Sequence, residues 1–170
     1  KRQNYNSPKE LYDAITPCTG EHPMHAISSG NYVLCDKDNY AYTNIGTTIA
    51  RYRLKEASKP EAGIELDSYL NIKDQVGSAW ALVGVVMTYD GYLVAAYNSG
   101  IVVVDRNLSG VVDTYSLPNG QVLTNSIAVE EDGGIYVASN SKEPSGDGLM
   151  QKIVWRGGHL STAEADGAWQ

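Results

Sequence analysis

Asp90-Gly91-Tyr92-Leu93-Val94-Ala95-Ala96 joins a turn to a short apolar strand, and about 42 residues later the chain repeats it as Asp132-Gly133-Gly134-Ile135-Tyr136-Val137-Ala138. Further strands are expected at 101–105 and 111–115 after the first stretch, and at 152–155 after the second. The Asp-Gly pairs tolerate the positive φ that tight hairpin turns need. No stretch longer than about ten residues has a helical period. The sequence therefore predicts an all-β chain of short strands.

An earlier and longer copy of the pattern is expected over residues 24–72, when Gly30 is set against Gly91. This alignment makes 32–35 the equivalent of 93–96, the second strand of the later copy. The expected strands of the early copy are, in order, 24–27, 31–35, 48–54 and 63–70. We therefore expect a lead-in segment over 1–23, followed by repeats over about 24–78, 79–122 and 123–170.

A repeat of this length, built from four short antiparallel strands, is typical of β-propeller blades. The 170 residues hold about three such blades. A blade cannot bury both of its faces alone, and a closed ring needs at least about four blades. We therefore expect the rest of the propeller to come from the same polypeptide or from another copy or chain.

Two segments resemble known propeller groups. The hairpin Asp105-Arg106-Asn107-Leu108-Ser109-Gly110-Val111-Val112 resembles the turn between the third and fourth strands of quinoprotein-like repeats. Residues 133–138 resemble the second strand of the six-bladed group that includes strictosidine synthases and lactonases. Together the resemblances imply a propeller fold over roughly 24–160. The turn has one residue more than the quinoprotein pattern, and Asp113 or Tyr115 replaces its closing Trp, which argues against binding of the quinone cofactor.

Composition and charge limit the classes of partner that are expected for this protein. The formal charge of −7 argues against nucleic acid, because phosphate binding needs a basic field. No apolar run reaches 18 residues, so no membrane span is expected. Cys18 and Cys35 form either a disulfide or two free thiols, and the sequence leaves both open. With the glycosylation sequon at Asn107, these features favour a secreted or periplasmic protein.

One candidate metal site lies near the start of the chain. Cys18, His22 and His25 follow one another at a spacing that lets imidazoles share a metal if the segment turns back on itself. His25 also lies on the expected innermost strand, where it is a candidate ligand-binding residue. The alternative is a structural histidine that is hydrogen-bonded at the start of a strand.

Candidate ligand-binding residues follow or precede the expected inner strands. Asn98 and Asn140 follow second strands, and Asn125 precedes an innermost one. The lactonase resemblance implies that Asn125 is a ligand of calcium, a cation that prefers oxygen ligands. The alternative is that these asparagines only form turns. We also expect tyrosines to be exposed contact residues; they are Tyr40, Tyr42 and Tyr97.

Two functions therefore remain open. The first is a non-catalytic propeller, or part of one, that presents a loop-lined face to a ligand or partner. The alternative is a calcium-dependent hydrolase of the six-bladed lactonase kind. No Ser/His/Asp nucleophile arrangement can be placed on the sequence, so whether the protein is an enzyme stays open.

Overall fold

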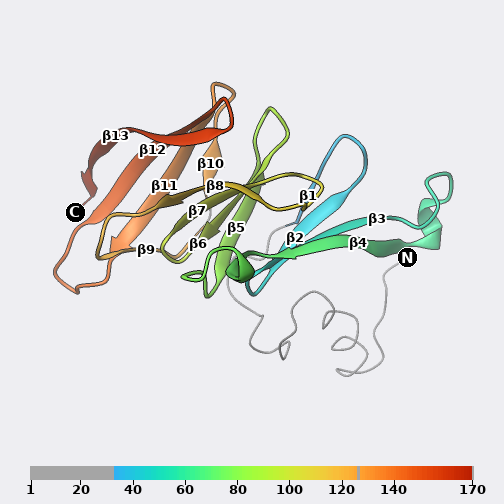
Figure 1. Ribbon diagram of the computed structural model, residues 1–170, viewed down its shortest axis with the longest axis horizontal. Coiled ribbons are helices and arrows are strands. Elements are labelled where there is room, and N and C mark those ends of the chain that lie inside the picture. Colours follow the sequence, from blue (N-terminus) through green and yellow to red (C-terminus); the bar gives the residue numbers. More distant parts are fainter. Residues whose placement is uncertain (1–32, 126, 170) are drawn as a thin grey trace.

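The computed structural model describes residues 33–125 and 127–169, which form three antiparallel β-sheets that lie side by side (Figure 1). The strands of the first sheet are β1 (Val33–Cys35), β2 (Ala41–Ile45), β3 (Thr48–Leu54) and β4 (Ile64–Asn71). Those of the second sheet are β5 (Leu82–Met87), β6 (Leu93–Tyr97), β7 (Gly100–Val104) and β8 (Val111–Ser116). Those of the third sheet are β9 (Gln121–Leu123), β10 (Ala128–Val129), β11 (Gly134–Ser141), β12 (Gly148–Arg156) and β13 (His159–Trp169).

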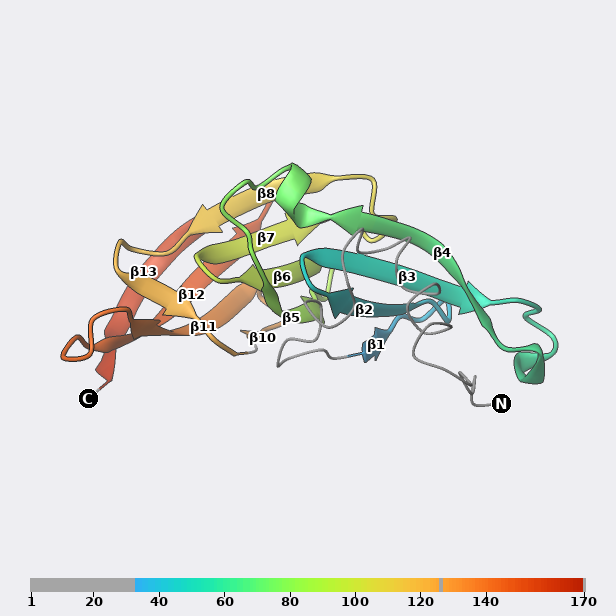
Figure 2. The same cartoon turned by 90° about the horizontal axis from the view of Figure 1, so that it is seen from below.

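Within each sheet the strands pair in chain order, so each sheet is an antiparallel meander. In the third sheet, β9 and β10 both pair with β11 and share the first position. Figure 2 shows the sheets fanned into an arc, with β1, β5 and β10 on the concave side and β4 and β8 on the convex side. Two short 3₁₀ turns, Pro60–Ala62 and Ile72–Asp74, precede and follow β4. Among the described residues, no helix has the length and apolarity needed to cross a bilayer.

The strand assignment predicted for the first sheet is wrong by one strand. Val33–Cys35 is the first strand of the described sheet, and Ala41–Ile45 takes the second position that was expected for 32–35. The reason is the turn between β1 and β2. There Asn39 has φ 65°, and it stands where Gly91 (φ 90°) and Gly133 (φ 92°) stand in the other two sheets. Asparagine adopts this left-handed conformation more readily than other residues with side chains. The expected strand at 24–27 and the lead-in over 1–23 lie outside the described residues.

Three equivalent backbone hydrogen bonds close this first turn of each sheet. Asp36 N donates to Tyr40 O over 2.9 Å, and Thr88 N donates to Tyr92 O over 2.8 Å. Glu130 N donates to Gly134 O over 2.7 Å. These bonds fix which positions correspond between the sheets.

Two apolar cores lie between the sheets. The strand β7 is fully buried, as suits the continuous apolar run from Ile101 to Val104. Val102 and Val104 pack with Ile49 and Leu82 in the core between the first and second sheets. The opposite face of β7 packs into the core between the second and third sheets, which contains Ile101, Val103, Ile135, Ile153 and Trp155.

The turns that follow the second strands join neighbouring sheets. Gly46 O accepts a hydrogen bond from Leu82 N of the second sheet over 2.9 Å. In the same way, Asn98 O accepts one from Leu123 N of the third sheet over 2.9 Å. The backbone of each turn therefore holds the first strand of the next sheet, and the connecting loops gather at this end of the molecule.

Candidate functional site

The loop end is the end of the sheets formed by the turns at 46–47 and 98–99 and by the connecting segments 72–81, 117–120 and 124–127. Asn98, Asn125 and Asn140, which the sequence predicted as ligand-binding residues, all lie here. The hairpin end is the opposite one, where the first and second strands of each sheet meet, along the upper edge of Figure 1.

Asn98 fixes the segment that leads into the second sheet. Its side-chain Oδ1 accepts a hydrogen bond from Trp80 N over 3.0 Å, and its Nδ2 donates to Ser78 O over 3.3 Å. The residue is only 8% exposed. Satisfying both of these backbone groups holds the loop in one conformation. Asn98 is therefore a positioning residue for its neighbours.

Asn140 and the segment before β10 form the part of the loop end on the third sheet. Asn140 Nδ2 donates to Thr124 Oγ1 over 3.0 Å. Thr124, Asn125 and Asn140 are all exposed. Leu123 is bound to Asn98 O, so this group is continuous with the Asn98 cluster. The exposed amide and hydroxyl groups of the loop end thus lie on the third sheet, and a backbone hydrogen bond joins their segment to the buried Asn98.

Trp80 is the functional candidate that the sequence analysis missed. It lies next to Asn98 in the segment that leads into β5, and 69% of its surface is exposed. Its own backbone N–H is held by Asn98. The available signal was weak, because Trp80 stands between Ala79 and Ala81 at the start of an apolar stretch, where a ring is normally expected to be buried.

The expectation that tyrosines are exposed contact residues is wrong for two of the three. Tyr97 is 1% exposed and Tyr42 is fully buried, while Tyr40 is half-buried. Both buried rings belong to the core between the first and second sheets. The β6 strand that carries Tyr97 is covered on both faces, which the pattern of that short segment did not reveal.

Of the predicted metal ligands, only Asn125 belongs to the described residues. Cys18, His22 and His25 fall outside the described residues. Within residues 33–125 and 127–169, no group of three or more His, Cys, Asp or Glu side chains is placed to hold a metal ion. Asn125 as a calcium ligand stays a prediction, as does pairing of the exposed Cys35 with Cys18.

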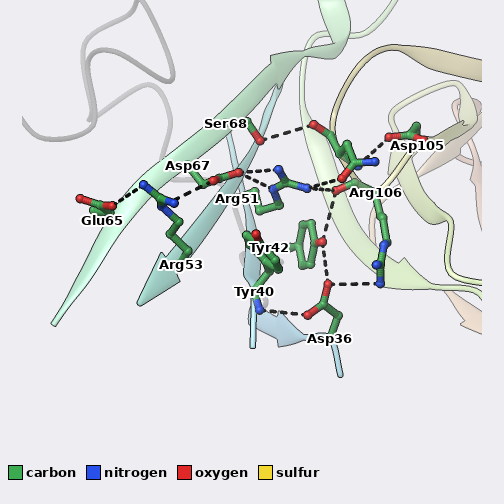
Figure 3. Close-up of polar contacts among 11 residues, drawn as sticks. Asp36, Tyr40, Tyr42, Arg51, Arg53, Glu65, Asp67, Ser68, Asp105 and Arg106 are labelled. Carbon is green, nitrogen blue, oxygen red and sulfur yellow. Dashed lines mark hydrogen bonds and ion pairs between the residues drawn. The ribbon is translucent and has the colours of Figure 1, made fainter. Parts of the chain in front are cut away.

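A polar cluster at the hairpin end joins the first and second sheets (Figure 3). Tyr42 Oη bonds with Asp36 Oδ2 over 2.9 Å and with Arg106 O over 3.2 Å. Arg51 donates to Arg106 O and to Asn107 Oδ1, both over 2.9 Å. Three side chains of one sheet thus hold the β7–β8 hairpin of the next. We call Asp36, Tyr42 and Arg51 the polar trio.

Charges extend this contact on both sides. Arg51 Nη2 pairs with Asp67 Oδ2 at 2.5 Å, and Arg106 Nη2 pairs with Asp38 Oδ2 at 2.7 Å. Burial and the hydrogen bond with Asp36 raise the pKa of Tyr42 to about 12. Burial by itself lowers the pKa of Arg51, but the hydrogen bond with Asp67 outweighs it and the pKa is raised. Both shifts favour a neutral Tyr42 beside a charged Arg51 at neutral pH.

The second and third sheets meet through a different set of contacts. Trp155 Nε1 donates to Asp90 Oδ2 over 3.0 Å, and the rings of Tyr92 and Trp155 meet edge to face at 5.1 Å. Leu160 N donates to Asp113 Oδ2 over 2.7 Å. Tyr89, 70% exposed, lines the hollows on both sides of the β5–β6 hairpin.

Comparisons with known proteins bear on the fold. No protein-family model matches the sequence. An uncharacterized protein of Archaeoglobus fulgidus is 32% identical over 99 residues, which are 55% of this chain and 19% of that protein. The chain therefore spans about a fifth of the length of the curated relative that it matches.

Two solved structures resemble the chain over most of its length. A europium-containing methanol dehydrogenase matches 82% of this chain and 25% of its own chain, with a TM-score of 0.58 and 12% identity. Virginiamycin B lyase from Staphylococcus aureus matches 82% of this chain and 42% of its own, with a TM-score of 0.50 and 14% identity. Both are β-propellers, as the sequence resemblances implied. The three sheets are therefore β-propeller blades of antiparallel strands.

Proposed function

We propose that these blades belong to a non-catalytic β-propeller that binds a ligand at the loop end, around Trp80, Asn125 and Asn140. The observation that carries the proposal is the exposed Trp80 ring on a backbone that Asn98 holds in place. A positioned ring beside amide groups suits a small ligand with one apolar face and several hydroxyl or amide groups. In propellers, ligands bind where loops converge at one end of the blades.

The chemistry of this surface supports binding over catalysis. Its exposed groups are neutral donors and acceptors from Thr124, Asn125 and Asn140. His159 is the one histidine among the described residues, and it lies at the opposite end, where β12 and β13 meet. A binding site needs no general base, so this composition is sufficient for the proposed role.

We also propose that the protein acts outside the cytoplasm and that its other blades complete the ring. Support for the location comes from the sequon at Asn107, which lies on the hairpin between β7 and β8. Support for further blades comes from the match to only part of each propeller structure.

A nuclear magnetic resonance titration of the ¹⁵N-labelled chain tests the ligand site. The probes are soluble oligosaccharides and short neutral peptides, which carry the hydroxyl, amide and apolar groups that the surface fits. Saturable shifts of the Trp80 indole and the Asn125 and Asn140 amides are expected. Trp80→Ala should weaken binding by about tenfold or more, because stacked aromatic contacts are commonly dominant in small sites.

Tyr89→Ala is the matched control, since Tyr89 is equally exposed but lies at the hairpin end. It should leave the titration unchanged. The proposal fails if no probe gives saturable shifts, or if the shifts centre on Tyr89 and survive Trp80→Ala.

A further inference from the structure

The outer face of the third sheet repeats the polar trio of the first. The backbone hydrogen bonds that close the first turns place Glu130 at the position of Asp36 and Tyr136 at that of Tyr42. The strand registers then complete the match: Tyr42 pairs with Arg51 on β3, and Tyr136 pairs with Lys152 on β12.

The two trios hold the same kinds of group but connect them differently: Asp36 bonds with Tyr42 in the first sheet, whereas Glu130 pairs with Lys152 in the third. Lys152 Nζ lies 2.9 Å from Glu130 Oε2 and 5.3 Å from the centre of the Tyr136 ring. In the first sheet, the Arg51 guanidinium lies 4.6 Å from the centre of a tyrosine ring, that of Tyr40. Each trio thus combines a cation, a tyrosine and a carboxylate on the face that points toward the next position in the arc.

The second sheet shows that this composition is not a requirement of the fold. At the corresponding positions it has Thr88, Val94 and Val103. Both valines are fully buried against the third sheet. The first sheet therefore has a polar trio where it binds a polar hairpin, and the second sheet has an apolar face where it binds apolar side chains.

A carboxylate on the first turn makes the same contact at both described junctions. Asp38 accepts from Arg106, and Asp90 accepts from Trp155. Arg106 and Trp155 are at equivalent positions. Arg106 lies two residues after Val104, which pairs with Leu93. Trp155 lies two residues after Ile153, which pairs with Ile135, the equivalent of Leu93. On the third sheet the corresponding carboxylate is Asp132, whose side chain is 55% exposed.

The rest of this outer face is open. Ala128 and Ala138 are exposed. The matching Ala96 of the second sheet is fully buried by its neighbour. The face thus resembles the face that the second sheet buries against the third, but here it is exposed.

We propose that the outer face of the third sheet binds a further antiparallel blade whose hairpin between the third and fourth strands is of the 105–110 type. That hairpin presents a backbone carbonyl to Lys152 and Tyr136 and an arginine or lysine to Asp132. Charge favours this occupant, because Glu130 and Asp132 outnumber the one cation of the trio. The proposal rests on the junctions and is independent of the ligand proposed at the loop end.

The test uses the full chain and a cyclised peptide of residues 103–112, which includes the hairpin that the first sheet binds. In a nuclear magnetic resonance titration, saturable shifts of the Asp132, Tyr136 and Lys152 resonances are expected. Asp132→Asn or Lys152→Met in the protein, or Arg106→Glu in the peptide, should each weaken binding about tenfold, as expected for one charge-assisted hydrogen bond. Asp147→Asn, in the loop between β11 and β12, is the control and should have no effect.

Three results would overturn the proposal. The first is the absence of saturable shifts up to the solubility limit of the peptide. The second is binding that survives Asp132→Asn and Lys152→Met together. The third is self-association of the chain through this face without peptide, seen in sedimentation equilibrium, which would make a second copy the occupant. None of these results affects the titration at Trp80, so the two proposals fail separately.

Discussion

The two junctions between the sheets place different chemistry on the same backbone. Between the first and second sheets, the polar trio holds a six-residue hairpin through its carbonyl and asparagine oxygens. Between the second and third, Val94 and Val103 pack against a sheet whose hairpin is the tight turn at Gly157 and Gly158. Only the aspartate on the first turn, Asp38 or Asp90, keeps its role.

The difference shows which parts of a junction can vary. The strand register and the turn carboxylate set where the next sheet lies, while the residues after the turn set which hairpin fits. A polar face requires a partner that satisfies its donors, because an unsatisfied buried polar group is costly. An apolar face requires only a matching shape.

The largest effect is expected from breaking the apolar junction. Trp155→Ala should lower the free energy of unfolding by roughly 3–5 kcal/mol, since it removes a ring that is 3% exposed and leaves a cavity. Urea unfolding followed by circular dichroism measures this. Trp155→Phe keeps an aromatic ring beside Tyr92 and should lower the free energy of unfolding clearly less. Equal losses of stability for the two variants would show that packing of the ring is not the main contribution of Trp155.

Breaking the polar junction should cost less. Arg51→Met is expected to lower the free energy of unfolding by about 3 kcal/mol, because it removes the nearer cation from Asp67 and one of the two donors from the hairpin carbonyl. Arg53 is a neighbouring control, since its side chain is 55% exposed against 12% for Arg51. Arg53→Met should cost no more than about 1 kcal/mol. Similar values for the two arginines in urea unfolding would contradict this ranking.

A pH titration isolates the tyrosine of the trio. The pKa of Tyr42 is raised from 10.0 to about 12, so the folded protein retains a proton that the unfolded chain loses. Stability is therefore at its full value below pH 10 and falls as the pH rises toward 12, by roughly 2 kcal/mol once solvent screening is allowed for. Unfolding curves across this range should be flatter for Tyr42→Phe than for the wild type.

The smallest effect on stability is expected at the loop end. Trp80→Ala should change the free energy of unfolding by less than about 0.5 kcal/mol, because the ring is 69% exposed. Asn98→Ala should cost more, about 1–2 kcal/mol, since it leaves the Trp80 N–H and the Ser78 carbonyl without their partner. The reverse order would show that Trp80 is a packing residue.

The sequence predicted the fold where local pattern and turn chemistry agree. The apolar run of β7 and the Asp-Gly turns at 90–91 and 132–133 were sufficient for the second sheet and for β11 and β12 of the third, but not for β9 and β13. The first sheet was misaligned because Asn39 adopts the positive φ that glycine has in the other two turns, whereas the alignment of the repeats was based on Gly30. The pair Asp38-Asn39, which stands just before the strand Ala41–Ile45, was the informative signal.

The candidate site stays a prediction, and only the placement of its residues can be compared with the structure. Asn98 follows β6 as predicted, whereas Asn140 lies within β11, because that strand continues to Ser141 and pairs there with β9. The burial of Tyr42 and Tyr97, by contrast, depends on the neighbouring sheet, which a pattern of single strands does not contain. The match between the trios of the first and third sheets needs strand registers, so it became visible only in the structure.

The most direct test of the account is a double-mutant cycle between Asp90 and Trp155. The carboxylate on the first turn of a sheet binds the next sheet, and Asp90 makes this contact by accepting from Trp155 Nε1 over 3.0 Å. Asp90→Asn and Trp155→Phe, alone and together, should give a coupling energy of about 1 kcal/mol in urea unfolding. Asp90→Asn combined with Trp80→Phe should show no coupling. A coupling of zero between Asp90 and Trp155 would contradict the account.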